Sequence, residues 1–143
     1  MQIEMVKIAA IKVNILRMDI EFTDPSILSV EAILEDLEEW YTKLPQELSI
    51  DNLGNVELSA DNRRSTYHVH LLHLGAVILL YRRIVSHILG TKTYNLKRDL
   101  MTRHVPVIRR VMNEGQVAAN NSGRLLGMLL LQNDVYQKCW LVM

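Results

Sequence analysis

The sequence predicts an all-α fold, namely a single-domain helical bundle of about five or six helices that can form oligomers. Its composition is 49% hydrophobic but only 6% aromatic, which suits helices packed through aliphatic side chains better than a β-sandwich. Apolar residues also recur at helical spacing along most of the chain. The length of 143 residues fits one domain with a core of its own.

The first element expected is a helix over residues 1 to 18, which is apolar on nearly every face. Its apolar positions include Ile3, Val6, Ile8, Ile11, Val13, Ile15 and Leu16. A helix that is apolar all round is covered by neighbours on most sides, so we expect a second subunit or sequence outside this chain to bury it. The charge balance, sixteen basic against sixteen acidic side chains, also favours self-association, because a neutral protein lacks the repulsion between monomers.

The strongest helical signal lies between residues 29 and 44, where Ser29 is suited to cap the helix. The apolar stripe consists of Val30, Ile33, Leu34, Leu37, Tyr41 and Leu44. Its spacing is that of an amphipathic helix, and the opposite face is acidic and expected to be solvated. Pro45 disfavours α geometry at the residue before it, so the helix is predicted to end there. We expect a loop over residues 46 to 61.

A longer helix is predicted to begin at Asp61 or Asn62, either of which can cap it, and to end near Leu89 with Gly90 as its stop. Residues 69 to 81 form an uncharged apolar run of about thirteen residues within it. A membrane-spanning helix needs about 20 such residues. We therefore expect a buried core helix and no contact with a membrane.

Three more helices are expected, over residues 96 to 113, 115 to 131 and 135 to 143. Pro106 lies inside the first of them and either kinks it or splits it into two. Gly123 and Gly127 weaken the second, but two glycines four residues apart can let helices approach closely. The chain is thus expected to continue as a bundle to its end.

Composition and cysteine content exclude several classes of function. The chain has no surplus of basic side chains, whereas a nucleic-acid binder draws most of its affinity from phosphate neutralisation. No direct nucleic-acid binding is therefore expected. Cys139 is the only cysteine, so neither an intrachain disulfide nor a cysteine-based zinc site can form, and a reducing compartment is favoured. Without a secretory signal near the start, we predict an intracellular protein, nuclear or cytoplasmic.

Three histidines, His68, His70 and His73, lie close together on the long central helix, and the last two share a face. A zinc ion needs three or four ligands, and no carboxylate stands at a suitable spacing on this helix. We expect histidines hydrogen-bonded in or beside the core, and neither a metal nor a cofactor. If the chain were an enzyme, His70 and His73 would be its catalytic candidates. No nucleophile elbow, phosphate-binding loop or dinucleotide motif is present.

The order of several short motifs resembles the middle homology region of fungal zinc binuclear-cluster transcription factors. A helix ending in Trp-x-x-x-Leu-Pro comes first, at residues 40 to 45. A helix rich in histidine and tyrosine follows over residues 67 to 82, then paired alanines at 117 to 119 and Cys-Trp at 139 and 140. The resemblance covers about residues 30 to 143. The chain departs from the family at Arg83-Ile84, where Arg-Pro is expected, so the helix can run on without a bend.

A second departure from the family is the DNA-binding module, which needs six cysteines and is absent from this sequence. The resemblance therefore implies a regulatory or protein-interaction module without DNA binding of its own, acting through helix association or an apolar ligand cavity. The alternative is a small enzyme or carrier for an apolar metabolite in a fungal biosynthetic pathway, which would use the histidine cluster. The candidate pocket residues are Trp40, His70, His73, Tyr81 and Arg82. Trp40 is also explained by packing alone, and Arg82 by the dipole at the helix C-terminus.

Overall fold

The computed structural model describes residues 2–18, 24–54, 58–90 and 102–131. Within these ranges there are four bounded α-helices, two short 3-10 helices and no strand. The elements are α1 (Gln2–Arg17), α2 (Asp24–Thr42), η1 (Gln46–Leu48), η2 (Ile50–Gly54), α3 (Ala60–Gly90) and α5 (Val105–Leu131). The prediction of an all-α fold is confirmed, whereas the predicted count of five or six helices is not. The helix predicted over residues 135 to 143 lies outside the described residues.

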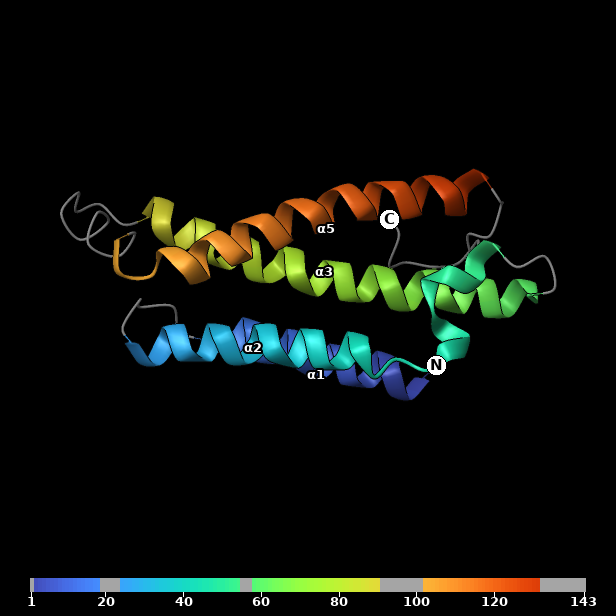
Figure 1. Ribbon diagram of the computed structural model, residues 1–143, viewed down its shortest axis with the longest axis horizontal. Coiled ribbons are helices and arrows are strands. Elements are labelled where there is room, and N and C mark those ends of the chain that lie inside the picture. Colours follow the sequence, from blue (N-terminus) through green and yellow to red (C-terminus); the bar gives the residue numbers. More distant parts are fainter. Residues whose placement is uncertain (1, 19–23, 55–57, 91–101, 132–143) are drawn as a thin grey trace.

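The helices form an elongated bundle in two layers, with α3 and α5 in one layer and α1 and α2 in the other (Figure 1). The central element is α3, which packs against α1, α2, α5 and both 3-10 helices. Its buried side chains include Val69, Ala76, Val77, Leu80 and Ile84. Every other described element is therefore positioned by its contact with α3.

The length and apolar composition of α3 are also those of a membrane-crossing helix, the one such helix in the described part of the chain. Core helices of soluble proteins share these properties, so the resemblance is weak evidence. Here α3 packs against helices of its own chain and carries buried polar groups at Thr66 and His70. The absence of membrane contact stays a prediction.

The boundaries of the helices differ from the predicted ones where proline and glycine are involved. Residues 102 and 103 are helical, the chain bends at His104, and α5 begins at Val105. Pro106 therefore lies in the first turn of α5, where its missing N–H leaves no hydrogen bond unmade. From there α5 continues through Gly115, although two separate helices were predicted around this residue. Ile84 stands after Arg83 where the family has a proline, so the helix was expected to be able to continue. It does, since α3 extends to Gly90.

Gly115 is the glycine at which two helices come closest. A Cβ atom placed there would lie 2.6 Å from Cγ and 2.7 Å from Cβ of Tyr81 on α3. Only a residue without a side chain allows this approach of α5 to α3. The spacing of Gly123 and Gly127 can permit such an approach, but no atom would lie within 4 Å of a Cβ at either position, so neither glycine is at a close contact between the described helices.

The first helix is covered on one side only. Ile8, Ile11 and Ile15 are buried against the rest of the chain. The outer face keeps large apolar side chains in solvent, with exposed fractions of 71% at Ile3, 67% at Val6, 41% at Val13 and 55% at Leu16. Among the described residues, no neighbour buries this outer face of α1.

Candidate functional site

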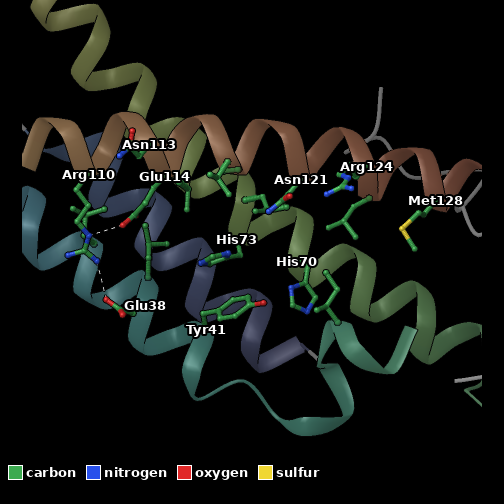
Figure 2. Close-up of a pocket in the computed structure, with 18 residues that line it drawn as sticks. Glu38, Tyr41, His70, His73, Arg110, Asn113, Glu114, Asn121, Arg124 and Met128 are labelled. Atoms are coloured by element: carbon green, nitrogen blue, oxygen red, sulfur yellow. Dashed lines mark hydrogen bonds and ion pairs between the residues drawn. The ribbon is translucent and has the colours of Figure 1, made fainter. Parts of the chain in front are cut away.

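An open groove of about 840 Å³ runs between α2 and α5, with α3 as its floor (Figure 2). The α2 wall consists of Leu34, Leu37, Glu38 and Tyr41. The floor is formed by His70, His73, Leu74 and Val77, with Ile50 of η2 at one side. The α5 wall consists of Arg110, Asn113, Glu114, Val117, Ala118, Asn121, Arg124, Leu125 and Met128. Nine of these eighteen residues are apolar, and apolar atoms form most of the lining surface.

The groove exists because α5 packs mainly on α3 and α2 packs mainly on α1, while α2 and α5 have few contacts with each other. The residues that α5 presents to it recur every three or four positions, from Arg110 to Met128, and so form one continuous face of the helix. A neighbouring face of α5 is held against α3 at Gly115. Two faces of one helix thus serve two purposes, one closing the core and the other lining an opening.

The floor contains a cluster of aromatic rings around His73. The His73 ring stacks on Trp40, with ring centres 5.2 Å apart and planes inclined by 15°, and Tyr41 lies 5.1 Å from it at a tilt. Nδ1 of His73 and Nε1 of Trp40 are buried, and neither atom has a hydrogen-bond partner among the described residues. Two unpaired polar atoms thus lie at or just behind the apolar floor.

Burial sets the charge of His73. It lowers the pKa of His73 to about 4, with a smaller contribution from the neighbouring His70, while the backbone carbonyl of Leu37 acts in the opposite direction. Above that pH the ring is a neutral imidazole. The floor of the groove therefore carries no positive charge at His73 near neutral pH.

His70 is committed to a structural hydrogen bond. The side chain is buried, and its Nε2 lies 2.9 Å from the backbone oxygen of Leu48 in η1. Because a carbonyl can only accept, Nε2 carries the proton and donates it. Burial lowers the pKa of His70, opposed by this hydrogen bond and by the charge of Asp51. The ring fastens η1 to α3 and also lines the groove.

The two ends of the groove differ in charge. At one end Arg110 donates from Nε to Glu114 at 2.7 Å and from Nη2 to Glu38 of α2 at 3.0 Å. The hydrogen bond to Glu114 is the main reason why the pKa of Arg110 is raised. Toward the other end lie Asn121 and Arg124 of α5, on the same side of the groove (Figure 2).

The residues predicted from the sequence fall in several places. His70 and His73 line the groove, and Trp40 lies behind His73 as its stacking partner. Tyr81 contacts Gly115 where α3 meets α5, and Arg82 is exposed and outside the groove lining. The ring of His68, the third histidine, faces the backbone oxygen of Arg64, 2.7 Å from Nδ1. The structure thus brings together Trp40, His70 and His73 of the predicted set and leaves Tyr81 and Arg82 outside the groove.

Sequence reasoning missed six polar residues of the groove, which are Glu38, Arg110, Asn113, Glu114, Asn121 and Arg124. The available signal was the spacing of residues 110, 114, 117, 121, 124 and 128 on one helix face. That spacing identifies a face but not its neighbour. Only the position of α2 in the structure shows that the face borders an opening.

The described residues contain no group of three or more histidine, cysteine or acidic side chains that could hold a metal ion. The chemistry available in the groove is therefore that of apolar contact, aromatic stacking and a few hydrogen bonds. Comparison with known proteins adds no family, because no family model, no curated protein and no solved structure matches the chain.

Proposed function

We propose that this chain is a non-catalytic regulatory module that binds an apolar small molecule in the groove between α2 and α5. The observation that carries the proposal is the groove itself. Its volume of about 840 Å³ lies within the range of small-molecule sites, about 300–1,000 Å³. Its lining is mostly apolar with a few polar groups, which is the composition typical of such sites.

The state of the two histidines supports binding over catalysis. A general base needs a free nitrogen that can take a proton near the working pH. Burial lowers the pKa of both rings, that of His73 to about 4, so both are weaker bases than a free imidazole. The alternative was an enzyme or a carrier for an apolar metabolite, and the state of these histidines favours a carrier.

The regulatory part of the proposal rests on how α2 and α5 are connected. The one ion bridge between these helices among the described residues runs through Arg110 and Glu38. A molecule inserted in the groove can change the spacing of α2 and α5 while both keep their contacts with α3. The proposal includes kinship with regulatory regions of fungal zinc-cluster factors, without DNA binding of its own. The motifs of that resemblance follow one another on the described helices: Trp40 lies on α2, the histidine-rich segment on α3, and residues 117 to 119 on α5.

The test is binding of N-phenyl-1-naphthylamine, an apolar probe whose fluorescence rises in apolar surroundings. Wild-type protein should bind it saturably. Val117→Trp should weaken binding about tenfold or more, because Val117 lines the groove and a larger ring there would fill it. The matched control is Leu28→Trp on α2, outside the groove lining, where the original side chain is similarly exposed, 64% against 57%. That variant should bind like the wild type.

The proposal fails if the folded wild-type protein does not bind the probe. It fails equally if Val117→Trp and Leu28→Trp weaken binding to the same extent, since the groove would then have no special role. Circular dichroism of both variants would verify that the helical content is unchanged.

We also propose self-association through the outer face of α1. The exposed residues Ile3, Val6, Ala10 and Val13 recur at alternating spacings of three and four, which is the pattern of a helix pair. A second copy of this chain, neutral like the first, could cover them. Light scattering should detect a dimer for the wild type and a monomer for Val6→Glu. A wild-type protein that stays monomeric at high concentration would contradict this part of the proposal.

A further inference from the structure

Arg124 is a cation at an apolar groove without a protein partner. It lines the groove, is exposed, and has no hydrogen-bond or ion-pair partner among the described residues. Asn121, one turn earlier on the same face of α5, is half-buried and likewise unpartnered within that part of the chain. Figure 2 shows the two side chains next to each other on the α5 side of the groove. Together they offer several N–H donors to whatever occupies the site.

The opposite end of the groove has the reverse polarity. Arg110 is flanked by the carboxylates of Glu38 and Glu114, so these three groups carry one positive and two negative charges. Nε of Arg110 donates to Glu114 and Nη2 donates to Glu38, so both nitrogens already have an acceptor. This end therefore repels an anion, whereas the Arg124 end attracts one.

The lining between these two ends combines rings and apolar side chains. The rings of Tyr41, His73 and His70 lie between Arg110 and Arg124 (Figure 2), and the apolar residues Leu74, Val77 and Val117 also belong to the lining. Arg110 and Arg124 are fourteen residues apart on one helix, a distance of about 21 Å at 1.5 Å per residue. The groove is thus long and apolar with a charge preference at each end.

We propose that the ligand of this groove is an amphiphile with an elongated apolar body and a single carboxylate head group. The carboxylate lies at Arg124 and Asn121, and the apolar body extends toward the Arg110 end. Arginine suits this role because its planar guanidinium binds a carboxylate through two parallel hydrogen bonds. This proposal rests on the proposed function, since it names the ligand class of the same groove.

The experiment compares three molecules of equal chain length, dodecanoate, dodecanol and dodecylamine, as competitors of N-phenyl-1-naphthylamine below their micelle-forming concentrations. The wild-type protein should bind dodecanoate most tightly and dodecylamine most weakly. Arg124→Gln should weaken dodecanoate binding about 10- to 100-fold, the range for hydrogen bonds to a charged group. Binding of dodecanol should change less than about twofold. Asn121→Ala should weaken dodecanoate by a smaller factor, about three- to tenfold.

The matched control is Arg109→Gln, which removes an exposed arginine from α5 outside the groove lining. It changes the net charge of the protein by the same amount and should leave dodecanoate binding unchanged. An equal loss in Arg109→Gln and Arg124→Gln would overturn the proposal, because the effect would then come from net charge alone.

Other outcomes separate this proposal from the one it rests on. If the probe binds in the groove but dodecanol competes as well as dodecanoate, and Arg124→Gln changes neither, the carboxylate site is refuted and the apolar site stands. Preference for dodecylamine would place the head group at the acidic end and also refute it. If the probe itself does not bind, the apolar site of the proposed function is refuted, and the carboxylate site that rests on it is refuted with it.

Discussion

The two neighbouring faces of α5 show how one helix can both close a core and leave an opening. Toward α3, Leu129 is buried, and Gly115 lets the backbone approach Tyr81. Toward α2, Val117 and Met128 remain largely exposed, and the helices are linked by an ion bridge at one end. The difference shows that the groove depends on the fit of α5 to α3, since α5 has few contacts with α2. Substitutions on each face test whether the two faces of α5 differ in this way.

The largest effect is expected from the adjacent residues Leu129 and Met128. Leu129 is fully buried in the cluster with Tyr67, so Leu129→Ala should lower the free energy of unfolding by about 2–5 kcal/mol through lost burial and the cavity left behind. Met128 lines the groove and is 42% exposed, so Met128→Ala should cost less than about 1 kcal/mol. Urea unfolding of both variants measures the difference. Similar losses would show that the groove face is as tightly packed as the core face.

The pH dependence of stability should come from the groove floor. Because the pKa of His73 is lowered to about 4, the unfolded chain binds a proton at this residue between about pH 6.5 and pH 4 and the folded chain does not. This contribution to stability is complete above about pH 6.5 and is lost as the pH falls. The loss should be about 1–3 kcal/mol, less than the full value of the pKa difference because the ring is not completely buried.

His73→Phe isolates this contribution, since phenylalanine keeps a ring for stacking on Trp40 but cannot bind a proton. Unfolding curves recorded from pH 7 to pH 4 should show a smaller fall in stability for the variant than for the wild type. Equal slopes in the two proteins would assign the acid sensitivity to other groups.

An intermediate effect is expected from the glycines of α5. Gly115→Ala should destabilise the protein by about 1–3 kcal/mol, because the new methyl group would meet Cβ and Cγ of Tyr81 and push α5 away from α3. Gly123→Ala should instead stabilise it by about 0.5–1 kcal/mol, since the position is open and alanine favours the helix. Thermal unfolding distinguishes the two signs. If both substitutions stabilise, the close contact at Gly115 does not exist.

The smallest effect is expected from the ion bridge between α2 and α5. The side chains of Arg110 and Glu38 are 42% and 67% exposed, so solvent screens the pair and Arg110→Gln should cost less than about 1 kcal/mol. Added salt should reduce that cost further. A double-mutant cycle with Glu38→Gln measures the pair alone. A salt-independent loss above about 2 kcal/mol would mean that the bridge holds the two helices together.

Much of the fold was predictable because helical periodicity and stop signals are local. The helix predicted from Asp61 or Asn62 to Leu89 is α3, Ala60–Gly90, and the stripe beginning at Val30 lies on α2. The errors come from non-local packing. The spacing of Gly123 and Gly127 drew attention to that pair, whereas the close contact is made by Gly115, because the sequence does not reveal which face of α5 meets α3.

The candidate site was predictable only in part, for a similar reason. His70 and His73 stand out because polar residues in an apolar run need partners. Trp40 joins them through stacking, which its position in the sequence does not reveal. Arg110 and Arg124 look like solvated charges in the sequence. Their importance depends on the position of α2 across the opening, which is a property of the assembled bundle.

The hydrogen bond from His70 to Leu48 joins two segments that are 22 residues apart in the chain. One edge of the imidazole is part of the groove, and the other restrains the backbone of η1. A molecule that displaces the ring must also release this carbonyl to water. Amide hydrogen exchange in residues 46 to 54 would then become faster. The exchange rate of this segment would therefore report whether the groove is occupied, without any label on the ligand.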